Sequence, residues 1–293
     1  MRKRERPLES PGVVILRHVK KHEWVFEWPR ITLKVRETLQ QGAKCIGPNP
    51  GKALLIFFRL VRRYPEYLDG QHYLALTLNR MGKVDQAFVI WKQAVRTALK
   101  FFPPHFSMDQ DRLEWGHVGN RPFLRLYQAY GMQLLTKGEP EDASEIFGNL
   151  LGLNPSDDQG VRGLVIGCYF ALNQPEEVLS VCRQFPNDGL EHLLYGKALA
   201  LFQVGHVKQA GQALDRAMRR FPLIALELSK TRHTRTTKSD EPYFSLGSRE
   251  QAYLYWLLHG RFWAETHGAI KFLRRRLLGS GDFPRRASGA GAE

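Results

Sequence analysis

A short pattern of glycine, alanine and a bulky apolar residue recurs three times in this chain. Each copy begins with a Gly, has an Ala five residues later, and has a large apolar residue nine residues after the Gly. A further small or apolar residue follows at the twelfth position, and a Pro stands at the seventeenth position in two copies. The copies contain Gly82, Ala87, Trp91 and Ala94; Gly138, Ala143, Phe147, Leu150 and Pro155; and Gly205, Ala210, Leu214, Ala217 and Pro222.

This pattern is typical of two antiparallel helices joined by a tight turn. The Gly tolerates the left-handed conformation that often ends a helix. The apolar residues that follow recur at spacings of three to five, which places them on one face of a second helix. The small Ala lets that helix lie close to its partner, and the Pro stops it.

At these positions the chain resembles the tetratricopeptide repeat family. The best copy also has aromatic and small residues where that family has them, and an earlier copy is visible around residues 51–65. The resemblance covers about residues 50–225 and implies an all-α fold, an α-solenoid of stacked helical hairpins with an insertion between two repeats. The matching residues are Tyr127, Tyr130, Gly131, Gly138, Ala143, Phe147 and Pro155 in the best copy, and Ala53, Phe57, Leu60 and Pro65 in the earlier one.

The distances between copies predict a degenerate repeat and an insertion. Gly138 and Gly205 are 67 residues apart, about twice the 34-residue tetratricopeptide period, so a further repeat should lie between them. Asn173 replaces the Gly of that repeat and Val178 replaces its Ala. Gly82 and Gly138 are 56 residues apart, and the excess falls on residues 102–122, which are rich in Pro, Gly and turn formers.

Two narrower resemblances concern parts of the chain. The stretches 113–125, 153–162 and 185–202 resemble bacterial tetratricopeptide proteins without an assigned activity, which implies a bacterial origin. The C-terminal stretch 247–273 is similar to the end of the eukaryotic suppressor-of-tumorigenicity proteins. The matching residues in that stretch are Gly247, Ala252, Tyr255, His259, Trp263, Gly268 and Ala269.

The pattern divides the chain into five parts. We expect an N-terminal arm at 1–29, disordered over 1–10 and with one or two short strands in 11–28, because β-branched and aromatic residues partly alternate there. The repeats then occupy 30–228, with the insertion at 102–122. A polar linker follows at 229–247, a capping helix pair at 248–278 (broken near residue 260), and a disordered tail at 279–293.

Charge and cysteine content point to a basic cytoplasmic protein. The chain has 43 Lys and Arg against 29 Asp and Glu, a formal net charge of +14. Its three cysteines, Cys45, Cys168 and Cys182, have no disulfide or metal spacing, which fits buried thiols in a reducing compartment. No apolar run is long enough to span a bilayer, and no secretion signal is recognisable.

Much of the positive charge falls at the ends of predicted second helices. Cations there complement the helix dipole, which is the structural interpretation. Stacked repeats would also align these ends into a basic stripe, so a nucleic-acid-associated protein is an alternative function. The residues are Arg59, Arg62, Arg63, Lys92, Arg96, Lys100, Arg216, Arg219, Arg220, Arg274, Arg275 and Arg276.

Two groups of residues are candidates for a metal or catalytic site. His18 and His22 are one helical turn apart, but lysines stand between them where zinc peptidases have an acid. The insertion offers a second group, and a metal site or enzyme built on it is another alternative; Asp109 or Asp111 would otherwise cap a short helix. That group is His105, Asp109, Asp111, Glu114 and His117. With no nucleophile, phosphate-loop or dinucleotide motif, we expect no catalytic residue and no cofactor.

The leading prediction is therefore a non-enzymatic scaffold that binds a partner protein or peptide. In tetratricopeptide proteins the first helix of each repeat lines a groove, which implies contacts from nine residues here. His72 and Leu76 stand where the family's carboxylate clamp has Lys and Asn, so chaperone tails are not the expected ligand. Asn120 would cap the helix that Pro122 begins, with Arg121 and Trp115 beside it. The nine residues are His72, Asn79, Arg80, Arg121, Arg125, Gln128, Met132, Tyr195 and Phe202.

Overall fold

The computed structural model describes residues 14–235 and 245–279. They form two compact units that divide between Arg162 and Gly163, within the range that the sequence assigns to one repeat domain. Three predicted segments lie wholly or largely outside the described residues. They are residues 1–10 and the tail 279–293, both expected to be disordered, and the centre of the predicted linker. The first unit contains one β-hairpin, and the other regular elements of both described units are helices. These helices stack in pairs, as predicted.

The first unit begins with two antiparallel strands, β1 (Ile15–Lys20) and β2 (Glu23–Glu27). Ile15 pairs with Glu27 and His18 with Trp24, and the turn places His22 at a φ of 59°. His18 therefore stands on a strand and His22 in the turn that follows it, so the two histidines are not one helical turn apart.

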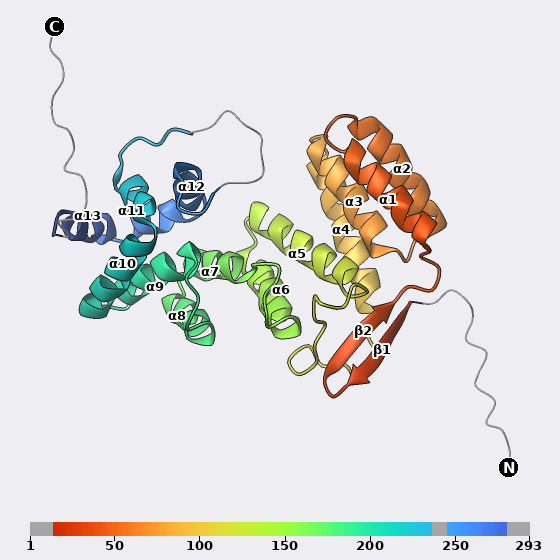
Figure 1. Cartoon of the computed structure of the whole chain (residues 1–293), viewed down its shortest axis with the longest axis horizontal. Coiled ribbons are helices and arrows are strands. Elements are labelled where there is room, and N and C mark those ends of the chain that lie inside the picture. Colours follow the sequence, from red (N-terminus) through yellow and green to blue (C-terminus); the bar gives the residue numbers. More distant parts are fainter. Residues whose placement is uncertain (1–13, 236–244, 280–293) are drawn as a thin grey trace, which may run out of the picture. The chain divides into compact units, whose positions relative to one another are not determined.

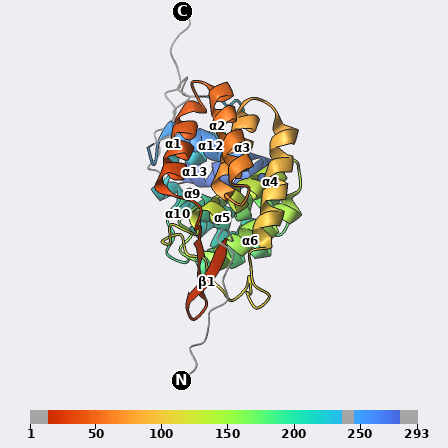
Figure 2. The ribbon, with the colours of Figure 1, turned by 90° about the vertical axis from the view of Figure 1, so that its right-hand side faces the viewer.

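Six helices follow in the first unit, and successive helices lie side by side (Figures 1 and 2). The residues after Gly82 and Gly138 begin the second helix of a pair, as the repeat predicts. The helices are α1 (Leu33–Cys45), α2 (Pro50–Arg63), α3 (Leu68–Arg80), α4 (Val84–Leu99), α5 (Arg121–Thr136) and α6 (Pro140–Leu153).

The repeat positions have the conformations and burial that the pattern requires. Gly82 and Gly138 both have a φ of +78°, the left-handed region that favours glycine. The Ala residues five positions later, Ala87 and Ala143, are completely buried. Gly131 faces the ring of Phe147 so closely that a β-carbon there would lie 2.8 Å from it, which explains why α5 and α6 need a glycine at their contact.

The second unit continues the pairs and adds a C-terminal group of helices. Asn173 has a φ of 55°, so it takes the place of the turn glycine in the degenerate repeat. Val178, in place of the Ala, is completely buried. The helices are α7 (Arg162–Ala171), α8 (Pro175–Gln184), α9 (Glu191–Gln203), α10 (Val207–Arg220), α11 (Pro222–Ser229), α12 (Arg249–Glu265) and α13 (Ala269–Gly279).

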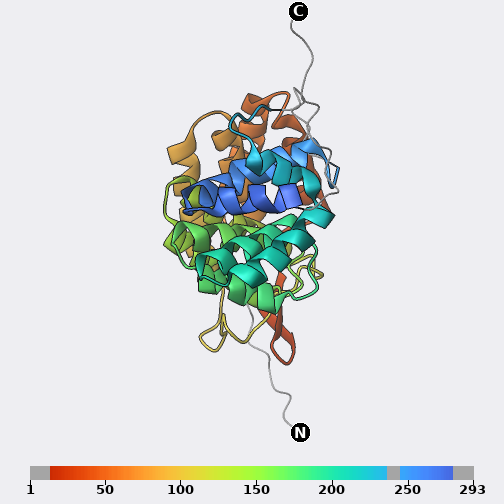
Figure 3. The ribbon, with the colours of Figure 1, turned by 90° about the vertical axis from the view of Figure 1, so that its left-hand side faces the viewer.

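The C-terminal helices differ from the expected pair in their break point. Pro222 ends α10 and at the same time occupies the first turn of α11. The last two helices are divided at residues 266–268, around Gly268 with its φ of +80°, rather than near residue 260. Gly260 instead lies inside α12, against the ring of Trp256. Figure 3 shows the blue C-terminal helices beside α10, which α11 and α13 both contact.

The insertion between α4 and α5 holds the β-hairpin. Asn120 is completely buried; its Oδ1 accepts the amide of Phe26 at 2.9 Å, and its Nδ2 donates to the carbonyls of Trp24 and Glu114. The backbone of Arg112 pairs with the hairpin on both sides, accepting from Trp24 at 3.0 Å and donating to His22 at 2.7 Å. Asn120 stands at the N-cap position of α5 without a side-chain cap bond, so the predicted capping role is wrong.

The insertion forms no helix for Asp109 or Asp111 to cap. Asp111 is buried, and its carboxylate accepts the backbone amide of Ser107 at 2.8 Å and lies 3.3 Å from His22. It therefore stabilises a turn. Burial alone would raise the pKa of Asp111, but the hydrogen-bonding groups of Ser107, Trp24 and His22 together lower it.

Candidate functional site

The structure places the nine predicted contact residues in two groups. Seven belong to α3 and α5, which pack against each other in the first unit. Tyr195 and Phe202 belong to α9 in the second unit.

Arg125 is the central residue of the first group. Its guanidinium binds the carboxylate of Asp69 through three hydrogen bonds of 2.7–3.1 Å, which tie α5 to α3. Asp69 is buried, and this burial raises its pKa, while Arg125 opposes the rise. Asp69 was not among the residues predicted from the sequence; the available signal was an acid between Leu68 and Gly70 in the first turn of a buried helix.

His72 lies one turn beyond Asp69 and is neutral at pH 7. The indole N–H of Trp91 points to its Nδ1 at 3.3 Å, so Nδ1 accepts and Nε2 carries the proton. Burial, with the nearby charge of Arg125, lowers the pKa of His72 to about 4. A neutral imidazole here can accept or donate a hydrogen bond but adds no charge to the surface.

Trp115 organises the arginines at the start of α5. Arg121 lies 5.2 Å from its ring centre and Arg125 lies 5.7 Å from it, both as cation–π contacts. The Nε of Arg121 also donates to the backbone carbonyl of Trp115 at 3.0 Å. Arg121 and Trp115 are both half-buried, so part of each remains accessible beside the pair of helices.

Gln128 is held by the segment that precedes α7. Gln159 donates to its Oε1 at 2.7 Å, and its own Nε2 donates to the Gln159 carbonyl at 3.3 Å. The amide of Gln159 also bonds the carbonyl of Leu124 at 3.1 Å. This exchange fixes the Gln128 side chain instead of leaving it free.

Three of the predicted residues have no side-chain partner within residues 14–235 and 245–279. Arg80 is exposed and Asn79 is half-buried at the end of α3, and Met132 on α5 is 46% exposed. An exposed methionine can contact apolar groups of another chain, and an exposed arginine can pair with its acidic groups. These three side chains, with the exposed part of Arg121, form the accessible part of the predicted surface.

The second group does not form a surface. Tyr195 is completely buried, and its hydroxyl donates to the carbonyl of Phe221 at 2.8 Å, so it belongs to the core. Burial raises its pKa well above the usual value. Phe202 is half-buried and packs on Phe272, with 4.8 Å between ring centres.

The insertion's candidate metal residues go to separate partners. His105 packs on Trp24, with 5.3 Å between ring centres, and His117 bonds Glu23 at 2.7 Å. Lys20 also pairs with Glu23, and these two partners lower the pKa of its carboxyl, Lys20 having the larger effect. In the part of the chain that the structure describes, no three His, Cys, Asp or Glu side chains are placed to hold a metal ion.

The basic residues at the helix ends have two kinds of surroundings: some lie in the last turn of a helix, and some pair with an acceptor on another helix. Arg62 and Arg63 lie in the last turn of α2, Arg96 in that of α4, and Arg219 and Arg220 in that of α10, where they complement the helix dipole. On α13, the Nε of Arg276 donates to the carboxylate of Asp215 at 3.1 Å, and the guanidinium of Arg274 donates to the carbonyl of Ser229. Among the helices that the structure describes, none is long and apolar enough to cross a membrane.

Comparison with known proteins identifies a family and a fold. The family model described as transcriptional repressor TCF25 matches residues 55–275, three quarters of the chain. The C-terminal stretch that resembles suppressor-of-tumorigenicity proteins, residues 247–273, lies inside that match. A search of curated proteins found no match.

Several solved structures of repeat proteins resemble the chain. A tetratricopeptide repeat protein from Parabacteroides merdae ATCC 43184 has a TM-score of 0.50 at 14% identity, covering 85% of this chain and 87% of that one. A Podosopora anserina putative kinesin light chain with TPR-like repeats has a TM-score of 0.47 at 16% identity, covering 64% and 94%. YrrB, described as a TPR protein with an unusual peptide-binding site, has a TM-score of 0.46 at 14% identity, covering 62% and 84%. The first of these confirms the tetratricopeptide-like fold.

Proposed function

The chain belongs to the TCF25 family, and from this premise we propose that it is a non-enzymatic scaffold that binds a partner protein or peptide. The fold supports the proposal, because paired helices present preformed surfaces that bind at little ordering cost. The family's description as a transcriptional repressor supports a partner from the machinery of gene expression.

The surface that we propose for this partner lies on α3 and α5. The observation that carries the proposal is the accessibility of three side chains that have no side-chain partner in the described residues. They are Asn79, Arg80 and Met132. Arg121 completes the surface with its exposed part. Three hydrogen-bonded residues hold the helices under this surface: Arg125 joins α5 to α3, His72 joins α3 to α4, and Gln128 joins α5 to the Gln159 segment.

A capture experiment tests this surface. The tagged full-length protein is compared with an Asn79→Ala, Arg80→Glu, Met132→Glu variant in nuclease-treated lysate at moderate salt. A control variant has the same kinds of change at exposed residues elsewhere, Asn187→Ala, Arg219→Glu and Val207→Glu. We expect a discrete protein that the control retains and the surface variant loses, with cross-links to α3 or α5. Equal retention by both variants would contradict the proposed surface.

A nucleic-acid-associated protein is the second candidate, favoured by the net charge of +14 and the family's description. It predicts that recovered nucleic acid vanishes as salt rises, because phosphate contacts release counterions. The same capture without nuclease distinguishes the two functions.

We propose that the partner determines the cellular compartment in which the protein works. The sequence favours the cytoplasm, whereas the family's description as a transcriptional repressor favours the nucleus. We propose that the protein works in the nucleus when its partner is bound there, which imaging of the tagged wild type and the surface variant tests. A cytoplasmic distribution for both would support the cytoplasmic prediction instead.

A further inference from the structure

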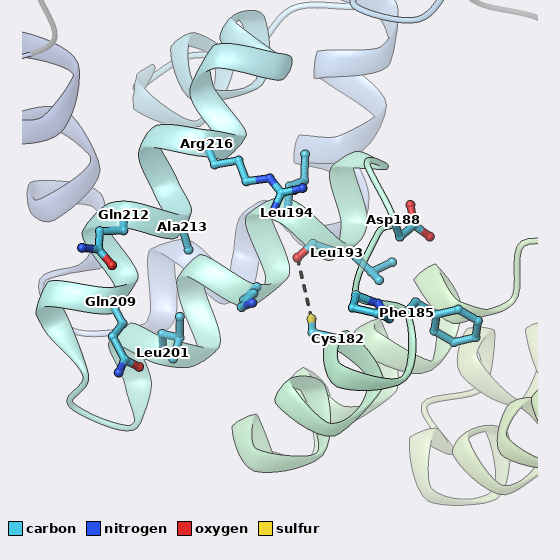
Figure 4. A pocket seen from close by; sticks show the side chains of 12 residues that line it. Cys182, Phe185, Asp188, Leu193, Leu194, Leu201, Gln209, Gln212, Ala213 and Arg216 are labelled. Carbon is cyan, nitrogen blue, oxygen red and sulfur yellow. Dashed lines mark hydrogen bonds between the residues drawn. The ribbon is translucent and has the colours of Figure 1, made fainter.

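The second unit contains a cavity of about 430 Å³ between the last turn of α8 and the length of α10, with α9 as its floor (Figure 4). It lies on helices outside the surface proposed above. Its lining residues are Cys182, Phe185, Pro186, Asp188, Leu193, Leu194, Lys197, Leu201, Gln209, Gln212, Ala213 and Arg216.

The floor of the cavity is apolar. Leu194 and Leu201 are seven residues apart on α9, so they stand on the same face two turns apart, and Leu193 lies beside them. All three are buried, with exposed fractions of 4–8%. Ala213 leaves space on the α10 side because its side chain is a single methyl group.

The rim of the cavity is cationic. Lys197, on the same face of α9, and Arg216 on α10 are exposed, and neither has a hydrogen bond or ion pair in the described part of the chain. Arg216 follows Asp215, but that carboxylate pairs with Arg276 and so leaves Arg216 available. Gln209 and Gln212 add exposed amides along the same helix (Figure 4).

The cavity is arranged for binding and not for covalent chemistry. The thiol of Cys182 points to the carbonyl of Leu193 at 3.8 Å. Burial raises the pKa of this thiol to about 11, so it stays protonated at neutral pH. The carboxylate of Asp188 accepts the amide of Leu190 at 2.7 Å, which commits one of its oxygens to the loop before α9.

We propose that this cavity binds an acidic segment of a partner protein, whose carboxylates pair with Lys197 and Arg216 and whose apolar side chain rests on the leucine floor. Charge complementarity supports this occupant, because a guanidinium binds a carboxylate through two parallel hydrogen bonds. The floor supplies the apolar contact that a small preformed site needs. A nucleic-acid strand fits less well, because Phe185 is the one aromatic side chain in the lining and single strands bind by stacking on such rings.

Fluorescence anisotropy with the full-length protein tests the proposal. The probe is a labelled twelve-residue peptide that repeats Asp-Glu-Leu-Leu, with a Lys-Lys-Leu-Leu repeat and an Asp-Glu-Ser-Ser repeat as comparison peptides. We expect the first to bind more tightly than either of the others. Equal binding of the Ser-containing peptide would overturn the role of the leucine floor.

Two matched double variants separate this cavity from the general positive charge. Lys197→Glu with Arg216→Glu should weaken binding of the acidic peptide at least about tenfold, because both carboxylate partners become repulsive. Lys208→Glu with Arg219→Glu makes the same change in net charge at exposed α10 residues outside the lining, and should weaken binding far less. Equal weakening by both pairs would overturn the proposal.

Filling the cavity gives an independent measurement. Ala213→Trp should abolish peptide binding while the circular dichroism and melting temperature stay near those of the wild type. Unchanged binding in this folded variant would show that the cavity is not occupied. A labelled single-stranded oligonucleotide is the last comparison: if the Lys197, Arg216 pair is needed for it and not for the peptide, nucleic acid replaces the acidic segment as the occupant.

These outcomes are independent of the scaffold proposal. The capture surface on α3 and α5 belongs to the first unit, and none of its residues changes in these variants. Failure of the peptide experiment therefore leaves the capture experiment standing, and the reverse also holds.

Discussion

The guanidinium of Arg125 binds the buried carboxylate of Asp69 through three hydrogen bonds, and so joins the first helices of two successive repeats. Fifty-six residues separate the two in sequence, and the insertion lies between them. Because Asp69 is buried, its charge depends on Arg125.

Arg125→Met should lower the free energy of unfolding by about 3–5 kcal/mol, because it leaves a buried carboxylate unpaired. Adding Asp69→Asn to it should restore most of the loss. Loss of Arg125 also raises the pKa of Asp69 further, so the deficit should shrink as the pH falls and the carboxyl becomes protonated. Urea unfolding at pH 7.5 and pH 5 measures both effects, with the exposed Arg59→Met as control. A deficit that grows on acidification would contradict this account.

Replacing Asn120 with Ala should release the β-hairpin from the insertion. The change removes the bonds to Phe26, Trp24 and Glu114 and leaves buried backbone groups without partners, at a cost of about 1–3 kcal/mol. Hydrogen exchange by mass spectrometry should show lost protection in β1 and β2 while α9 and α10 stay protected. Asn187→Ala, at an exposed loop position, should change neither region. Unchanged protection of the hairpin would show that two other contacts hold it without Asn120. These are the Trp28–Gly119 hydrogen bond and the backbone bonds of Arg112.

Acidification should destabilise the protein through its buried histidines. Burial lowers the pKa of His259 well below its usual value and that of His72 to about 4, so the unfolded state takes up protons first. Their contribution is fully present above about pH 6.5 and falls by about 1.4 kcal/mol per pH unit for each histidine below it. His259→Phe should reduce this dependence between pH 6.5 and 5, as followed by urea midpoints. The exposed His206→Gln serves as control, and equal slopes for wild type and His259→Phe would be the contrary result.

Two glycines of one repeat should respond oppositely to alanine. Gly138 has a φ of +78°, so Gly138→Ala should cost about 1–2 kcal/mol. Gly148 lies inside α6, and a β-carbon added to it would meet no atom within 4 Å beyond its chain neighbours and the local helix backbone, so Gly148→Ala should stabilise by about 0.5–1 kcal/mol. Thermal unfolding of both variants measures the difference. Equal signs would mean that the turn after α5 does not need its left-handed residue.

The repeat architecture could be read from the sequence because its determinants are local. A turn residue, a small residue five positions later and a bulky one at the ninth position recur in three hairpins, where they pair helices that are neighbours in the sequence. The structure confirms this even in the degenerate copy, where Asn173 takes the left-handed conformation and Val178 is buried. Asn, like Gly, tolerates that conformation, so the exception follows the same rule.

Only the tertiary structure determined which residues contact one another between these helices. Asn120 looked like a helix cap, but packing brought the hairpin amide of Phe26, 94 residues away, to its side chain. Tyr195 looked like a groove residue, yet it is buried against Phe221. The cavity between α8 and α10 depends on where Lys197, Ala213 and Arg216 meet across two helices. Local spacing determines which face of a helix is apolar, whereas the partner that covers that face depends on contacts between residues distant in sequence.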